Sequence, residues 1–212
     1  EVKVPMVLVT STGGGYSDGG QHSQCLYGTF AHLPGMKVVC PSNAYDAKGL
    51  LLQAIRDDDP VLFFEPKALY QAACEVPDEM YTIPFGKAAF VREGDDVTVV
   101  AFGQMVGRAA AAIDALEALG ISCDLIDPRT SSPLDEDAIL ESVEATGRLI
   151  VIDESPPRCG LTADIAGLAA DRAFHALKAP IKQVCAPHSP TPFAPELEAA
   201  YLPSVERIKA TI

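Results

Sequence analysis

The sequence has no tryptophan, only four histidines and few basic side chains. Its 212 residues include 16 Lys and Arg against 29 Asp and Glu, which gives a formal net charge of −13. Binding to nucleic-acid phosphates requires a basic surface, so this balance argues against a nucleic-acid partner. The longest apolar runs, such as residues 97–102, are far shorter than the ~20 residues needed to cross a bilayer. We therefore expect a soluble protein that binds neither nucleic acid nor a membrane.

The six cysteines lack the spacing of a metal or disulfide motif. They are widely separated along the chain, without a Cys-x-x-Cys pair, and several lie in strand-like or helical runs. A structural zinc site needs ligands a few residues apart, and the four histidines do not complete such a set. We predict free, buried thiols in a reducing compartment.

The first 70 residues alternate short apolar runs with turn signals. Three strands are predicted there, at 5–9, 37–40 and 61–64. Between the last two, Ser42 is predicted to cap a helix that runs to about Arg56. A strand, a helix and a strand in this order predict a parallel crossover unit. Residues 65–84 lose the periodicity and contain three prolines, which is typical of a linker.

The second half repeats the α/β pattern. Its strands are predicted at 97–102, 122–126, 149–152 and 181–184. Helices are predicted between them, from Val106 to Gly120, from the Ser132 N-cap to Thr146, and from Leu161 to Ala176. Strands separated by helices of this length predict a mostly parallel sheet covered on both faces. We place the domain boundary near residue 84.

A glycine-rich loop, residues 13–20, follows the first predicted strand and leads to His22. It lacks the endings of a phosphate loop and of a dinucleotide fingerprint, so phosphate binding is weakly supported. Its glycines permit a sharp turn with room beside it for a cofactor or substrate. Imidazole can exchange a proton near neutral pH, so His22 is the candidate catalytic residue; the alternative is a solvated bystander. His188, in a proline-rich stretch, is expected to be a surface loop residue.

Three acids, Asp57 to Asp59, close the helix that is predicted to begin at Ser42. Negative charge at a helix C-terminus opposes the macrodipole and costs about 0.3–1 kcal/mol per charge. A cation held by the carbonyls of Ala54 and Asp57 and an oxygen of Asp59 would reverse that cost. The residues alone leave this ion site open against a solvated acidic turn.

Several segments, in order and with matching gaps, resemble one family over essentially the whole chain. They include Gln-His-Ser-Gln-Cys at 21–25, Asp-Ala-Lys-Gly-Leu-Leu at 46–51, Phe-Glu-Pro-Lys at 64–67 and Asp-Pro-Arg-Thr at 127–130. The chain resembles the beta subunit of thiamin-diphosphate-dependent 2-oxoacid dehydrogenases, the decarboxylase components of the pyruvate, branched-chain 2-oxoacid and acetoin complexes. Residues 151–159 and 186–190 look most like the acetoin branch.

This resemblance implies an α/β fold: part of a transketolase-like pyrimidine-binding domain with its linker at 1–84, then a transketolase C-terminal-like three-layer α/β/α domain at 85–212. It implies that His22 lies near the cofactor and substrate, transfers protons and helps to pass the acyl group to lipoate. It also implies a potassium ion held largely by carbonyl oxygens of five residues: Met6, Ala54, Ile55, Asp57 and Asp59. The resemblance thus favours the ion site over the solvated turn.

The resemblance further implies a set of partners. These are an alpha subunit in a heterotetramer, a second beta subunit and a lipoyl acyltransferase core, in the cytoplasm or, in a eukaryote, the mitochondrial matrix. Thiamin diphosphate would be shared between subunits, with its diphosphate and magnesium held by the alpha subunit. Which 2-oxoacid is the substrate, or whether it is acetoin, does not follow from these residues.

The chain begins Glu-Val-Lys-Val-Pro, within a strand-like run that has no initiator Met and no targeting segment, which predicts the later part of a longer protein. The family's catalytic glutamate would precede residue 1, so we expect the chain alone to be inactive. The leading hypothesis is part of a dehydrogenase beta subunit. The alternatives are a non-catalytic oligomerisation and docking module, and half of a fused transketolase or deoxyxylulose-phosphate synthase.

Overall fold

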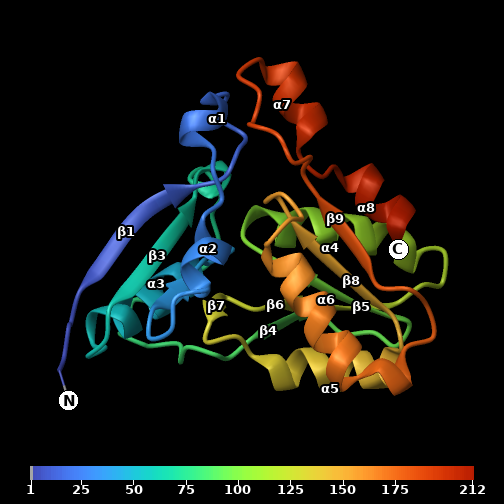
Figure 1. Ribbon diagram of the computed structural model, residues 1–212, viewed down its shortest axis with the longest axis horizontal. Coiled ribbons are helices and arrows are strands. Elements are labelled where there is room, and N and C mark those ends of the chain that lie inside the picture. Colours follow the sequence, from blue (N-terminus) through green and yellow to red (C-terminus); the bar gives the residue numbers. More distant parts are fainter. Residues whose placement is uncertain (1) are drawn as a thin grey trace.

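The computed structural model describes residues 2–212 as two β-sheets with helices packed against them (Figure 1). The strands are β1 (Val7–Thr12), β2 (Lys37–Val39), β3 (Val61–Pro66), β4 (Ala89–Arg92), β5 (Val97–Ala101), β6 (Cys123–Asp127), β7 (Thr130–Ser132), β8 (Leu149–Asp153) and β9 (Lys182–Cys185). The α-helices are α1 (Gly19–His22), α2 (Tyr27–Ala31), α3 (Ala44–Ile55), α4 (Gln104–Glu117), α5 (Glu136–Thr146), α6 (Leu161–Arg172), α7 (Pro195–Tyr201) and α8 (Val205–Thr211). Two short 3₁₀ helices are η1 (Lys67–Leu69) and η2 (Phe174–Ala176).

The first sheet has the strand order β1-β3-β2-β7. Strands β1 and β2 both pair with β3 in parallel, and α3 connects β2 to β3. This arrangement is the crossover unit predicted from the sequence, since parallel neighbours need a long connection. Strand β7 comes from much later in the chain and pairs antiparallel with β2. The first sheet is therefore completed by a strand from the second half of the chain.

The second sheet has the order β4-β6-β5-β8-β9, with only β4 antiparallel. All five residues of β5 and of β8 are buried, because helices cover both faces of the sheet. Helices α4 and α8 pack on one face and α5 and α6 on the other (Figure 1). The α/β class with a mostly parallel sheet is as predicted.

A continuous apolar core joins the two sheets. The ring of Tyr27 from α2 lies 5.9 Å from that of Phe64 on β3 and 6.1 Å from that of Phe102 after β5. An ion pair between Arg129 and Asp46 at 2.7 Å also links the two halves, and both side chains are largely buried. Because this junction is packed and hydrogen-bonded, residues from both halves can form one site.

The predicted helix starts were wrong by a few residues. The N-cap of α3 is Asn43, whose side chain accepts from the Asp46 N–H at 2.8 Å, and not Ser42. Ser132 belongs to β7, and α5 is capped by Asp135. In both places two polar candidates stand close together, and the one predicted as the cap hydrogen-bonds elsewhere: Ser42 to Asp127, and Ser132 to the Met36 carbonyl at 2.7 Å.

Other predictions also need correction. Strand β3 and helix η1 extend into the predicted linker, and the helix expected to reach Ala176 ends at Arg172 and is followed by η2. Strands β4 and β7 and helices α1, α2, α7 and α8 were not predicted. All six cysteines are free, but Cys74 and Cys159 are exposed because they lie in irregular segments. None of the helices within residues 2–212 has the length and apolar character that a membrane crossing requires.

Candidate functional site

The glycine-rich loop after β1 has a backbone that other residues adopt only with strain. Gly13 and Gly15 have φ values of 86° and 105°, in the region that favours glycine. A Cβ at Gly13 would lie 2.6 Å from Oε1 of Glu154, which directly follows β8. At Gly13, where the sequence predicts room for a cofactor or substrate, the space beside the backbone is therefore filled by the Glu154 carboxylate.

Both polar groups of Gly14 are hydrogen-bonded to side chains from the second half of the chain. Its N–H donates to Oε2 of Glu154 at 2.9 Å, and its carbonyl accepts from Nε2 of Gln104 at 3.1 Å. Gln104 also donates to Glu154 at 2.7 Å. A second carboxylate, Glu198 on α7, faces the next turn of the loop. A phosphate would meet two buried acids here, so this loop is not a phosphate cradle.

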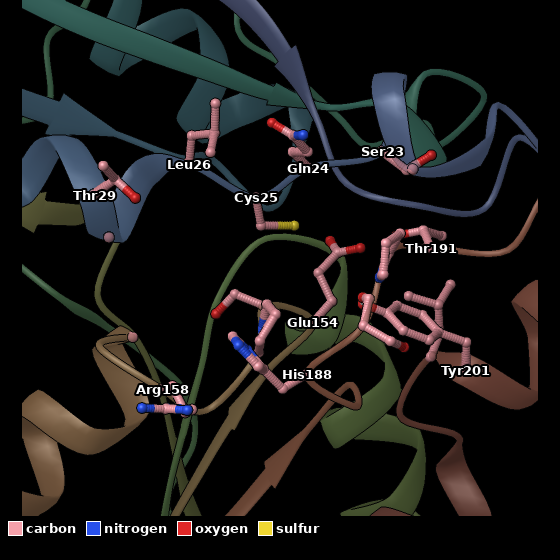
Figure 2. A pocket seen from close by; sticks show the side chains of 18 of the residues that line it. Ser23, Gln24, Cys25, Leu26, Thr29, Glu154, Arg158, His188, Thr191 and Tyr201 are labelled. Atoms are coloured by element: carbon pink, nitrogen blue, oxygen red, sulfur yellow. The ribbon is translucent and has the colours of Figure 1, made fainter.

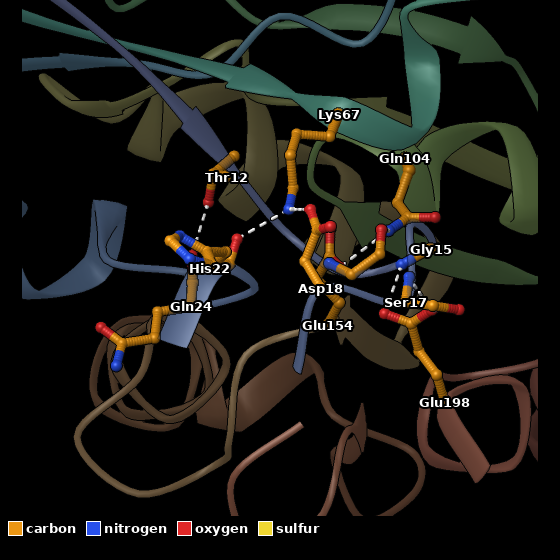
Figure 3. Close-up of polar contacts among 11 residues, drawn as sticks. Thr12, Gly15, Ser17, Asp18, His22, Gln24, Lys67, Gln104, Glu154 and Glu198 are labelled. Carbon is orange, nitrogen blue, oxygen red and sulfur yellow. Dashed lines mark hydrogen bonds and ion pairs between the residues drawn. The ribbon is translucent and has the colours of Figure 1, made fainter. Parts of the chain in front are cut away.

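His22 is the last residue of α1 and is exposed. Its carbonyl accepts a hydrogen bond from Nζ of Lys67 at 2.7 Å, and the same ammonium forms an ion pair with Asp18 (Figure 3). Within residues 2–212 no hydrogen bond engages the His22 imidazole. The backbone of the predicted catalytic histidine is thus held, while its ring is free to meet a substrate.

A cavity of about 640 Å³ opens where the two halves of the chain meet (Figure 2), and His22 itself is not among the residues that line it. Residues on either side of His22 line it, together with residues that follow β8 and β9, including Glu154, Arg158 and His188. The size is that of a small-molecule site. Burial raises the pKa of the Cys25 thiol in the lining well above its ordinary value, which excludes a thiolate nucleophile at neutral pH.

Two consecutive acids are buried where β8 ends at the cavity. Asp153 accepts hydrogen bonds from the hydroxyls of Tyr27 and Ser155, and burial raises its pKa. Burial, opposed by the Gly14 N–H and reinforced by the charge of Asp153, raises the pKa of Glu154 to about 7. Glu154 is therefore a buried group of this junction whose charge changes near neutral pH.

The Glu154→Gln variant is expected to become more stable relative to wild type as pH rises. The folded pKa of about 7 lies above the ordinary 4.5, so the stability that Glu154 contributes is complete below pH 4.5 and is lost as pH rises through 7. The difference in unfolding free energy between variant and wild type should shift by roughly 3 kcal/mol from pH 4.5 to pH 8. Denaturant unfolding at several pH values measures it. The exposed Glu79→Gln is the control, and a flat difference for Glu154→Gln would contradict the prediction.

The acidic turn after α3 is paired with lysines. Nζ of Lys37 lies 2.6 Å from Asp57 and 3.1 Å from Asp59, and Lys3 lies 2.7 Å from Asp58. Burial alone would raise the pKa of Asp57, but the hydrogen bond from Lys37 lowers it overall. The ammonium groups of Lys37 and Lys3 therefore supply positive charge that offsets the unfavourable interaction of the aspartates with the helix dipole.

The carbonyl oxygens named by the resemblance nevertheless gather at one end of the first sheet. The Met6 carbonyl accepts from the Val61 N–H at 2.9 Å, which places it beside the turn that connects α3 to β3. Helix α3 ends at Ile55, and within residues 2–212 the Ala54 carbonyl accepts only from the Asp57 and Arg56 amides in the following turn. A carbonyl oxygen has two lone pairs, so these groups fit a hard cation. Within residues 2–212 no cluster of three or more His, Cys, Asp or Glu side chains suits a metal.

Four residues that organise the site escaped the sequence analysis: Lys67, Gln104, Glu154 and Glu198. Glu154 had a usable signal, because it follows a buried strand of a parallel sheet and sites form at the carboxyl ends of such strands. The other three stand in unremarkable helical or loop contexts. Their importance arises only from contacts with residues far away in the sequence.

Two family models match most of the chain. Residues 1–72 match the family described as "Transketolase, pyrimidine binding domain", and residues 86–208 match "Transketolase, C-terminal domain". The chain belongs to the transketolase family. The resemblance and the fold class inferred from the sequence are confirmed, whereas the boundary near residue 84 stays a prediction.

Curated relatives of this chain are named as oxidoreductase or dehydrogenase beta subunits. "Acetoin:2,6-dichlorophenolindophenol oxidoreductase subunit beta" of Bacillus subtilis is 53% identical over 98% of this chain and 61% of its own length. The protein of the same name from Cupriavidus necator is 52% identical over 99% of this chain and 62% of its own length. "Pyruvate dehydrogenase E1 component subunit beta" of Bacillus subtilis is 44% identical over 98% of this chain and 64% of its own length. The chain therefore spans less than two thirds of each of these relatives.

A solved structure has the same fold. "Split gene transketolase, inactive beta4 tetramer" superposes with a TM-score of 0.80, covering 98% of this chain and 65% of that one. At 23% identity, this likeness concerns the fold alone.

Proposed function

We propose that this chain is part of the beta subunit of a 2-oxoacid or acetoin dehydrogenase complex. It would support thiamin-diphosphate-dependent oxidative decarboxylation, or cleavage of acetoin, with acyl transfer to lipoyl groups. The observation that carries the proposal is the exposed imidazole of His22, whose carbonyl is held by Lys67 and whose neighbours in the chain line a cavity. The identity of 53% to an acetoin oxidoreductase subunit favours the acetoin branch.

In this proposal His22 transfers protons to and from the substrate and stabilises the acyl group as it passes to lipoate. Thiamin diphosphate, when bound, supplies the carbon nucleophile of the reaction. The loop amides are occupied by Glu154 and Glu198, so this part of the chain does not fit the diphosphate. We therefore assign the diphosphate and its magnesium to an alpha subunit, within a heterotetramer that also contains a beta–beta contact and docks on an acyltransferase core.

The proposed function is tested by turnover of the assembled complex. The full-length beta subunit, its alpha partner and a lipoyl acceptor are assayed with pyruvate, branched-chain 2-oxoacids and acetoin. We expect lipoate-dependent turnover with one substrate class, acetoin first, and none from residues 1–212 alone. An assembled complex that binds thiamin diphosphate but turns over no substrate would contradict the proposal and favour the oligomerisation and docking module.

We further propose that the carbonyls at the end of α3 hold potassium, with the ligand positions Met6, Ala54, Ile55, Asp57 and Asp59. Support comes from the Met6 carbonyl, which hydrogen-bonds to the first residue of β3, and from the end of α3 at Ile55. The Lys37 ammonium already pairs with both aspartates and offsets one of their two negative charges, so the ion would be held by carbonyl dipoles more than by carboxylate charge.

The melting temperature should be higher in potassium than in N-methylglucamine at equal ionic strength. A cation that binds only the folded state stabilises it by about 2.7 kcal/mol at a hundredfold excess over Kd. The size-mismatched lithium ion is the control for a general salt effect. Equal melting temperatures in all three salts would count against the ion site.

The domain division near residue 84 is also a proposal. It is supported by the irregular chain between η1 and β4, which contains neither helix nor strand. Because β7 adds a strand to the first sheet, the second domain would complete the first even if the boundary lies there.

A further inference from the structure

Helix α1 and the loop before it, residues 13–22, have few contacts of their own to hold them in place. In α1 only Gly19 is buried, and the Asp18 side chain makes no capping hydrogen bond. A single helical turn is unstable in water, because ordering it costs more conformational entropy than its hydrogen bonds return. The placement of His22 therefore depends on side chains outside the segment.

Glu198 supplies one such contact from α7. Its side chain is buried, and its carboxylate accepts from the N–H groups of Gly15 at 2.9 Å and Ser17 at 2.8 Å (Figure 3). Among residues 2–212 no Lys, Arg or His forms an ion pair with this carboxylate. The loop amides are thus its compensating partners, and charge-assisted hydrogen bonds of this kind are strong.

Lys67 supplies the second contact, from η1. Only 7% of the residue is exposed, and its ammonium binds both the carboxylate of Asp18 and the carbonyl of His22. Asp18 immediately precedes α1 and His22 ends it, so one side chain holds both ends of the helix (Figure 3). A buried ammonium without partners is costly, so Lys67 needs these two acceptors as much as the helix needs Lys67.

We propose that Glu198 and Lys67 are positioning residues that fix His22, whose neighbours in the chain line the cavity between the two halves. Glu198 sets the path of the loop that enters α1, and Lys67 sets the helix itself. Neither hydrogen-bonds to the imidazole, so both act through the backbone. This inference rests on the proposed function of His22 and assigns part of its control to α7, more than 170 residues further along the chain.

The first test compares Glu198→Gln with Glu196→Gln in the full-length beta subunit assembled with its alpha partner. Glutamine keeps the size of Glu198 but turns an NH2 group toward one of the two amides. Glu196 is exposed on the same helix and loses the same charge. The rate at which diethyl pyrocarbonate modifies His22, followed by peptide mass, should change about threefold or more in Glu198→Gln, because the exposed imidazole leaves the surroundings that the fixed loop gives it. Glu196→Gln should match wild type.

Turnover gives the second measurement. In Glu198→Gln, kcat should fall about tenfold, the effect of one charge-assisted hydrogen bond, while KM changes little because the cavity is retained. Lys67→Met should behave in the same way, and Lys67→Arg should recover part of kcat because a guanidinium can donate to both oxygens. The exposed Lys87→Met is the matched control.

Wild-type modification rates and wild-type kcat in both Glu198→Gln and Lys67→Met would overturn the proposal. A loss of kcat that follows the melting temperature, with His22 modified at the wild-type rate, would also overturn it, because the role would then be structural only. If Glu198→Gln does not fold, the Lys67 series decides alone. The modification rate needs no substrate, so it still judges the positioning if the dehydrogenase assay fails.

Discussion

Replacing His22 by alanine is expected to lower lipoate-dependent kcat of the assembled complex by about 100-fold or more, the range lost with a general acid or base. The fold should survive, because the imidazole is exposed and the contacts that hold α1 use the His22 carbonyl, which alanine retains. The loss should therefore appear in kcat with an unchanged melting temperature. Steady-state turnover with the preferred substrate, together with a thermal melt, measures both.

The matched control is His175→Ala. His175 is also an exposed histidine in a short helix, but it lies in η2, and neither His175 nor its neighbours in η2 line the cavity. It should leave kcat unchanged. Wild-type turnover by His22→Ala with every 2-oxoacid and with acetoin would remove the catalytic assignment and leave the histidine as a solvated bystander.

The α/β pattern was predictable because burial on both faces leaves a simple signal. Strands β5 and β8 are fully buried and therefore consist of unbroken apolar runs. Strand β7 carries no such signal, since its three residues are Thr, Ser and Ser. It forms because it pairs with the edge of β2, and this edge comes close to it only in the folded tertiary structure. A strand can be predicted from local sequence when its side chains are apolar because both of its faces are buried by apolar neighbours.

The candidate site divides in the same way. His22 could be found from the sequence, because a histidine that ends a glycine-rich loop is an interpretable local pattern. The reason for the glycines could not be found. Gly13 needs its bare backbone because the Glu154 carboxylate, 141 residues later, occupies the place of a Cβ. The loop and its acidic partners are one unit only after the two halves of the chain have packed together.

The acidic turn shows that the net charge of a site depends on partners that the local sequence does not reveal. Three consecutive aspartates at a helix end suggest an unmet need for a cation. Lys37 lies twenty residues earlier than Asp57, yet its ammonium meets this turn because β2 runs beside β3. The net charge of such a site can therefore be predicted only when it is known which strands lie beside each other and in which register.

Gly94→Ala is expected to be the most destabilising of these substitutions, lowering the free energy of unfolding by roughly 3 kcal/mol. An ideal Cβ at Gly94 would lie 2.3 Å from the backbone nitrogen of Cys123 and 2.6 Å from the carbonyl carbon of Ser122. These are backbone atoms at the start of β6 and cannot rotate away. The turn would have to move, which weakens the bond from the Gly94 N–H to Asp124 at 2.9 Å. Denaturant unfolding of the chain measures the loss.

Gly107→Ala provides the control, because it makes the same chemical change in an open place. Gly107 is exposed in the interior of α4, and an added Cβ would meet no atom within 4 Å. Alanine there should stabilise the protein by about 0.5–1 kcal/mol through helix propensity. Opposite signs for the two variants would show that contact with β6, and not a general intolerance of alanine, decides the outcome. A Gly94→Ala variant as stable as wild type would mean that the turn before β5 can withdraw from β6 at little cost.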